Sequence, residues 1–186
     1  MSARLGLDTA TPYLALALWS PEHGVLARRA PQVARDHAAR LIPELDALFA
    51  TAGVQRREVR AVTVGIGPGS YTGVRVGLAA AHALATAWDV PLGGAGTLAQ
   101  MAAGALAPGE TGVAVVDARR DAVYAAVYLR RAGDDALQCL EAPQKRARVE
   151  VRRAWPDARW LEDVAPDAAW AARRPPGEEP ATALYL

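Results

Sequence analysis

The sequence contains one cysteine, Cys139, one lysine, Lys145, and no asparagine. A single cysteine excludes an internal disulfide framework. No apolar run approaches the ~18 residues that a membrane-spanning helix needs. The first residues lack the basic segment and small-residue cleavage site of a secretory signal. A net charge of +1 gives no general attraction to nucleic acid. We therefore expect a cytoplasmic protein that does not associate with membranes.

What the chain does contain is enough apolar material for a core. Hydrophobic residues make up 52% of its 186 residues, which suits one ordinary domain or two small lobes. Alternating and helical periodicities predict three strands followed by helix, strand, helix, strand and helix. The predicted segments are 4–7, 13–19, 25–29, 38–52, 59–66, 73–88, 91–96 and 97–106, with Asp36 and Thr97 as helix caps and Gly53 as a helix stop. This order is an α/β pattern and resembles the ribonuclease-H-like fold.

Two segments echo each other. Each has a predicted strand that ends in an aspartate, then a turn and a second strand: LGLDTATPYLALALW at residues 5–19 and VAVVDARRDAVYAAVYL at residues 113–129. Asp8 and Asp117 occupy equivalent places. One interpretation is two unrelated hairpins. The other is a duplicated, actin-like fold with two lobes, 1–106 and 107–186, of mixed sheets flanked by helices, a class in which such aspartates face each other across a nucleotide cleft.

GIGPGSYTGVR, residues 65–75, joins a predicted strand to a predicted helix. It lacks the GK[ST] of a P-loop, the spacing of a dinucleotide fingerprint and the flanking glycines of a nucleophile elbow. Two interpretations stay open. The free amides of the helix start, with Ser70, Thr72 and Arg75, suit an anion. Alternatively, the glycines form a tight turn that lets the helix pack closely.

The combination LGLDTAT, RDHAARLIPELDALFATAG, GIGPGSYTGVRVGLAAAHALA and VDARRDAVYAAVY resembles the TsaB family over residues 4–128, with a weaker return at 179–186. The resemblance implies a non-catalytic subunit that binds and activates its catalytic paralogue TsaD in threonylcarbamoyladenosine modification of tRNA. It also implies a TsaE-like ATPase in the same complex, a homodimer when the chain is alone, and only indirect contact with tRNA. We expect that no cofactor is required, with weak binding of ATP or ADP with Mg²⁺ at a partner interface as the alternative.

The resemblance also directs attention to particular residues. TsaD holds a metal with a His-x-x-x-His pair, but here His37 is followed four residues on by Leu41, so no metal site and no catalytic residue are expected. We expect a degenerate phosphate or nucleotide site at Asp8, Thr9, Gly67, Gly69, Ser70, Thr72, Gly73 and Asp117. We expect a helical partner interface that includes Leu41, Leu45, Leu48, Gly77, Ala81 and Ala85.

One alternative function remains, a small stand-alone ATPase or phosphotransferase with the actin fold. Enzymes of that class need a glycine pair late in the chain to admit the adenosine. After Gly112 only Gly133 and Gly177 remain, far apart in the sequence. The adenosine side of a cleft is therefore missing, which favours the non-catalytic subunit.

Overall fold

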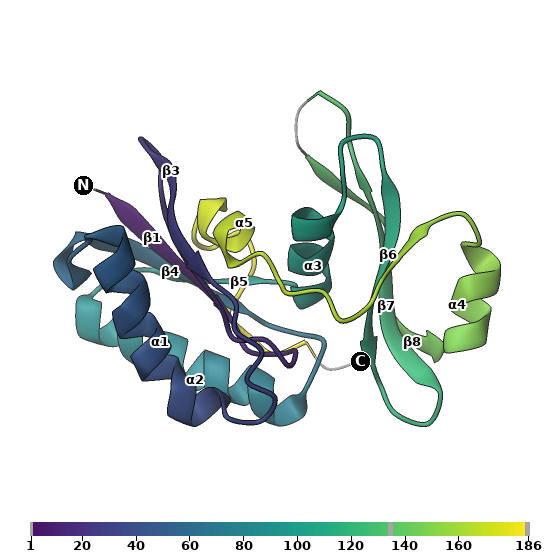
Figure 1. Ribbon diagram of the computed structural model, residues 1–186, viewed down its shortest axis with the longest axis horizontal. Helices are drawn as coiled ribbons and strands as arrows, with labels where there is room; N and C mark the ends of the chain where they lie inside the picture. The colour runs from purple at the N-terminus through teal and green to yellow at the C-terminus, as the bar shows by residue number, and fades with distance from the viewer. Residues whose placement is uncertain (1, 134–135, 185–186) are drawn as a thin grey trace.

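The computed structural model describes residues 2–133 and 136–184, in which two β-sheets lie side by side with helices against their faces (Figure 1). The first sheet has the strand order β3-β2-β1-β4-β5. Strand β1 pairs antiparallel with β2 and parallel with β4, so the sheet is mixed. The elements of this lobe are β1 (Ala3–Asp8), β2 (Ala15–Ser20), β3 (Gly24–Arg29), α1 (His37–Ala52), the short 3₁₀ helix η1 (Arg56–Glu58), β4 (Val59–Gly65), α2 (Tyr71–Trp88) and β5 (Leu92–Ala95).

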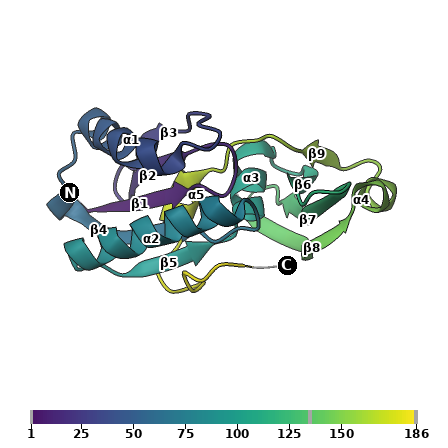
Figure 2. The ribbon, with the colours of Figure 1, turned by 90° about the horizontal axis from the view of Figure 1, so that it is seen from below.

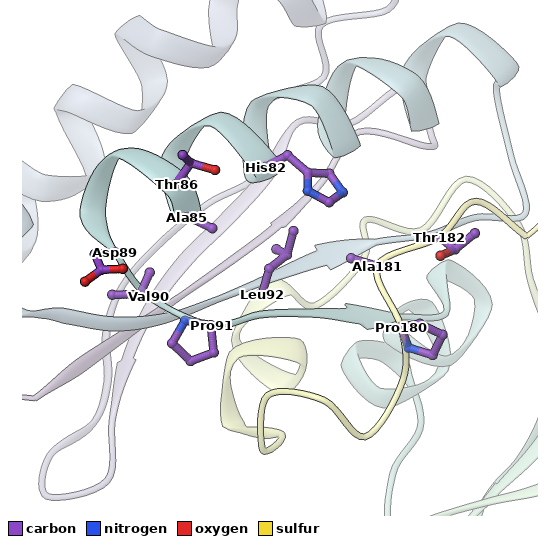
Figure 3. Close-up of a pocket in the computed structure, with 10 residues that line it drawn as sticks. All are labelled: His82, Ala85, Thr86, Asp89, Val90, Pro91, Leu92, Pro180, Ala181 and Thr182. Carbon is purple, nitrogen blue, oxygen red and sulfur yellow. The ribbon is translucent and has the colours of Figure 1, made fainter.

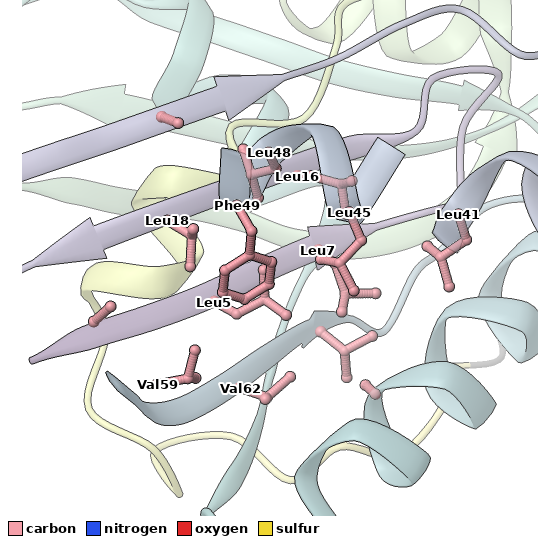
Figure 4. Close-up of a cluster of buried hydrophobic side chains, with 14 of the residues drawn as sticks. Leu5, Leu7, Leu16, Leu18, Leu41, Leu45, Leu48, Phe49, Val59 and Val62 are labelled. Atoms are coloured by element: carbon pink, nitrogen blue, oxygen red, sulfur yellow. The ribbon is translucent and has the colours of Figure 1, made fainter. Parts of the chain in front are cut away.

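Side-chain size differs between the two faces of this sheet. Successive strand residues point to opposite faces. Leu5, Leu7, Leu16 and Leu18 pack with α1 and α2 in the main core (Figure 4). On the opposite face Gly6, Ala15 and Ala17 are small, and there α5 (Ala168–Arg173) packs on β1 and β2. A Cβ atom on Gly6 would lie 2.0 Å from the Ala168 carbonyl oxygen, so this glycine permits the close approach of α5.

The second sheet has the order β8-β7-β6-β9 and is also mixed, because β6 pairs antiparallel with β7 and parallel with β9. Helix α3 covers one face through Leu98 and Met101, while α4 covers the other through Val151. The elements are α3 (Thr97–Ala105), β6 (Thr111–Asp117), β7 (Ala122–Arg130), β8 (Leu137–Ala147), α4 (Arg148–Ala154) and β9 (Arg159–Leu161).

The chain crosses twice between the two sheets. Helix α3 follows the first sheet in sequence but packs on the second, and α5 follows the second sheet but packs on the first. After α5, the last described segment runs along β5 (Figure 2). The Gly94 amide donates to the Glu179 carbonyl at 2.7 Å, and the Leu184 amide donates to the Ile66 carbonyl at 2.8 Å. The division of the chain at residues 106 and 107 stays a prediction.

The sequence echo is confirmed, because β1–β2 and β6–β7 are both antiparallel hairpins whose first strand ends at Asp8 and Asp117. Asp36 is the N-cap of α1, as predicted, although its side chain makes no capping bond. One helix start differs from expectation, because Gly96, not Thr97, is the N-cap of α3. Gly53 ends α1 in a left-handed conformation, as predicted. None of the helices in the described ranges combines the length and hydrophobicity needed to cross a bilayer.

Candidate functional site

The glycine loop, residues 65–70, lies against the turn that joins β1 to β2. The Ser70 amide donates to the Ala10 carbonyl at 2.8 Å, and the Ser70 hydroxyl accepts from the Gly73 amide at 3.2 Å, which caps α2. The Thr9 hydroxyl donates to the Gly73 carbonyl at 2.7 Å. Several polar groups of the loop and helix start are therefore bonded within the chain.

Four glycines leave room that the β1–β2 segment fills. A Cβ atom on any of them would approach an atom of residues 8–10 to within 2.4 Å, far inside van der Waals contact. The nearest distances would be 1.9 Å at Gly65, 2.3 Å at Gly69, 2.1 Å at Gly73 and 2.4 Å at Gly77. These glycines permit close packing of the loop and α2 on β1, which favours the tight-turn interpretation of the motif.

Asp8 is fully buried at the end of β1. Its Oδ1 accepts from the Ala10 amide at 2.8 Å, and its Oδ2 accepts from Thr97 Oγ1 at 2.7 Å and from Gln100 Nε2 at 2.8 Å. Burial raises the pKa of this carboxyl from 3.8 to about 6, because desolvation outweighs the three hydrogen bonds that favour the charged form. At neutral pH the group is a carboxylate with both oxygens bonded inside the chain.

Six of the eight residues predicted for a nucleotide site lie where the glycine loop and the start of α2 meet the end of β1 and the β1–β2 turn: Asp8, Thr9, Gly67, Gly69, Ser70 and Gly73. Thr72 is exposed on the first turn of α2. Asp117 is exposed at the end of β6 in the other lobe, where its Oδ1 accepts from the Arg119 amide at 3.2 Å. The predicted pair of facing aspartates is therefore unequal, with one carboxylate enclosed and the other open to solvent.

A cavity of about 110 Å³ lies between the two lobes. Thr11 and Pro12 line it from the β1–β2 turn, and Val115 and Asp117 line it from β6, while Asp8 does not reach it. Pockets that enclose small-molecule ligands typically measure roughly 300–1,000 Å³. The cavity is therefore too small for a nucleotide in this arrangement of the lobes.

A larger groove of about 880 Å³ lies elsewhere, between the second half of α2, β5 and the segment 180–182 (Figure 3). Its walls include His82, Asp89 and Pro180. Of the residues predicted for a site or an interface, only Ala85 lines it. This groove is separate from the glycine loop and from Asp8.

The residues predicted for the partner interface lie inside the chain. All six residues are buried against the first sheet of the same chain: Leu41, Leu45, Leu48, Gly77, Ala81 and Ala85. Helix α2 has small residues on several sides, so the periodicity could not tell which of its faces covers the sheet. The sheet-facing stripe is 77, 81 and 85, and the exposed stripe is 71, 75, 79, 83 and 87.

His37 is buried at the start of α1, with Nε2 3.1 Å from the Tyr13 carbonyl oxygen. Leu41, one turn later, packs in the core. The histidine thus serves to join α1 to the segment before β2.

Two polar residues of the site were not predicted in their roles. Thr97 was expected to cap α3, but its hydroxyl bonds to Asp8, 89 positions earlier. Gln100 was not singled out at all. The available signal was that it stands alone as a polar residue in the run LAQMAAGALA. A buried polar side chain in an apolar helix needs a partner, but the sequence does not say which.

The fold identifies the class of protein to which the chain belongs. Two mixed sheets, each opening on a hairpin whose first strand ends in an aspartate, make a duplicated ribonuclease-H-like, actin-like protein. The solved structure of YeaZ from Pseudomonas aeruginosa is similar over all of both chains, with a TM-score of 0.80 and 26% sequence identity.

The family follows from the sequence comparisons. Residues 21–152 match the family model described as TsaD, tRNA N6-adenosine threonylcarbamoyltransferase. The chain therefore belongs to the TsaD family, and its relatives place it with the TsaB members, as its motifs predicted. It is 38% identical over 128 residues to the tRNA threonylcarbamoyladenosine biosynthesis protein TsaB of Escherichia coli, covering 68% of this chain and 54% of that protein. It is 31% identical over 135 residues to the TsaB of Bacillus subtilis, covering 69% and 56%. The chain thus spans about half the length of the curated relatives it matches.

Proposed function

We propose that this chain is a non-catalytic subunit required for threonylcarbamoyladenosine modification of tRNA, and that it binds and activates a TsaD-like paralogue in the cytoplasm. The observation that carries the proposal is its membership of the TsaD family combined with a cleft closed by its own residues. A TsaE-like ATPase would join the same complex, tRNA would be contacted only indirectly, and the chain would form a homodimer when alone.

The closed cleft supports a role without chemistry. Asp8, the residue that would handle a metal or phosphate in an actin-like enzyme, has both oxygens occupied by the chain's own donors. The 110 Å³ cavity beside Asp117 has no room for a nucleotide. We propose that no cofactor is required. Any weak site for ATP or ADP with Mg²⁺ would have to form with a partner, because the cleft is too small.

The exposed stripe of α2 is the surface we propose for the paralogue. It consists of Tyr71, Arg75, Ala79, Ala83 and Ala87. Tyr71 is 60% exposed, and its hydroxyl accepts a hydrogen bond from Arg75 at 2.8 Å. The alanines leave the helix backbone close to the surface, so a partner helix can approach it closely, while an aromatic and an arginine are the residue types that dominate binding energy at interfaces.

The test is co-purification with a TsaD-like paralogue from the same genome, with titration of binding and mass spectrometry of tRNA nucleosides. We expect Ala83→Arg to weaken binding at least tenfold, because the new guanidinium would prevent close approach of the partner. Ala142→Arg, on the exposed outer strand β8, is the matched control and should bind normally.

Two results would overturn the proposal. Normal binding by Ala83→Arg would remove the partner from this face of α2. A wild-type chain that ignores the paralogue, yet hydrolyses ATP in a reaction abolished by Asp8→Ala or Asp117→Ala, would instead be the stand-alone ATPase.

A further inference from the structure

Asp8 is bonded to elements that belong to different cores. The residue itself ends β1, in the middle of the first sheet. Two of its three hydrogen-bond donors, Thr97 and Gln100, come from the first turns of α3. Helix α3 packs on the second sheet, where Leu98 and Met101 are fully buried or nearly so. The carboxylate therefore joins the first sheet to the helix that covers the second.

The glycine loop is hydrogen-bonded to Thr97, the same residue that donates to Asp8. The Thr97 amide donates to the Gly67 carbonyl at 2.8 Å, and the Thr97 hydroxyl oxygen accepts from the Gly67 amide at 3.1 Å. Gly65 leaves the space that the Asp8 carboxylate fills. The Asp8 carboxylate thus contacts both α3 and the glycine loop and holds the two in place.

Gln100 connects this contact to β5 and to the start of α5. Its side-chain Nε2 also donates to the Ala95 carbonyl at 3.1 Å, and its backbone carbonyl accepts from the Asp167 amide, just before α5, at 3.1 Å. Its Oε1 is buried and has no hydrogen-bond partner among the described residues. Turning the amide over would set Oε1 against two acceptors, Asp8 and Ala95. The carboxylate therefore fixes the amide orientation even though one amide oxygen stays unsatisfied.

We propose that Asp8 is a positioning residue: its buried carboxylate locks α3, and with it the second lobe and the glycine loop, onto the end of β1. In this role the carboxylate is a structural acceptor, not a ligand for a metal or a phosphate. Removing it should loosen the lobes relative to each other while both sheets remain folded.

Distance measurement between the lobes tests this directly. Cys139 is the sole cysteine and is exposed on β8, so it can carry one spin label. Ala79→Cys, on the exposed stripe of α2, supplies the second. We expect a narrow distance distribution in this background and at least a doubling of its width when Asp8→Ala is added. Hydrogen exchange of residues 66–70 and 96–101 should rise at least tenfold.

Glu44→Ala is the matched control. Glu44 is also a buried carboxylate, but its partners Arg29 and Arg40 belong to the same lobe. It should leave the distance distribution and these exchange rates unchanged, even where it lowers overall stability.

Thr97→Val keeps the shape of the side chain and removes its donor, so it serves as a second probe if Asp8→Ala does not fold. It should broaden the distribution, and Thr97→Ser should restore it. Adding Thr97→Val to Asp8→Ala should change little further, because both act on one joint. An unchanged distribution in Asp8→Ala, or in Thr97→Val where only that variant folds, would overturn the proposal. Equal broadening by Glu44→Ala would do the same.

Discussion

Replacing Ala81 by arginine tests which face of α2 belongs to the core. Ala81 is fully buried and packs in the main cluster under the first sheet. On either side along the same stripe are Gly77, whose missing Cβ atom makes room for the Thr9 hydroxyl, and Ala85. Because Ala81 has no exposed surface, a longer side chain there would have to displace its neighbours.

The magnitude follows from two effects. A buried charge without a partner destabilises a protein by about 3–5 kcal/mol, and forcing extra volume into a packed core adds about 1–3 kcal/mol. Together they amount to roughly 4–8 kcal/mol, a large part of the ~5–15 kcal/mol that holds a typical domain folded. For a chain of this length about 1 kcal/mol shifts Tm by roughly 2–4 °C, so Ala81→Arg should lower Tm by at least about 8 °C or prevent folding.

Urea unfolding and thermal melting of Ala81→Arg and Ala83→Arg provide the assay. Ala83 lies on the exposed stripe two residues later, where surface substitutions usually change stability by less than about 0.5 kcal/mol. Both variants add the same side chain to the same helix, so helix propensity and net charge are matched. If Ala81→Arg were as stable as Ala83→Arg, the assignment of the two faces would be wrong.

The remaining predictions concern Asp8 and its neighbour. The pKa of Asp8 is about 6 in the folded chain, against 3.8 when the group is exposed. Between these two pH values the folded state therefore holds a proton on Asp8 that the unfolded state has lost. Stability should therefore fall as pH rises from about 4.5 to 7, by about 2 kcal/mol, and Asp8→Asn should remove this slope in urea titrations. A wild-type slope equal to that of Asp8→Asn would contradict the raised pKa. Gly65→Ala should lower the free energy of unfolding by more than about 2 kcal/mol, because its Cβ atom would lie 1.9 Å from Asp8 Oδ2. Gly96→Ala, whose Cβ atom would meet nothing closer than 4.0 Å, is the control, and equal losses in the two variants would refute the packing argument.

Local pattern was sufficient to predict most of the first lobe. The helical spacing after Asp36 reflects one buried and one exposed face. The alternation in residues 13–19 instead separates leucines on one buried face of β2 from alanines on the other, which α5 covers. The strands and helices appear close to the expected ranges. The repeated strand, aspartate and hairpin was readable for the same reason. By contrast β8, β9, α4 and α5 had no predicted counterpart. Strand β8 is largely exposed, β9 and α4 are short, and α5 packs on β1 and β2, which lie far earlier in the sequence, so none of them carries a clear local pattern.

The opposite faces of α2 have residues of similar size and polarity. Gly77 and Ala81 on one side are matched by Ala79 and Ala83 on the other, so neither side is marked as the core. The choice is made by β1 and β4, which present Leu7 and Val64 to the helix. A helix of small residues can be recognised from the sequence, but its orientation is a tertiary property.

The glycine loop presents the same limit at a functional site. A glycine permits any close approach, whether of a phosphate or of the chain's own backbone, so the motif alone could not separate the two. The structure decides through what occupies the space: the carbonyl oxygens of Thr9 and Ala10 and the carboxylate of Asp8 lie where a Cβ atom would be. A loop shaped to receive a phosphate keeps its amides directed at that anion, whereas here Gly67 and Ser70 donate theirs within the chain. The residues that would serve a nucleotide in an actin-like enzyme are thus used to join the two lobes, and this is why an enzyme's fold can persist in a subunit whose proposed role is to be recognised by a partner.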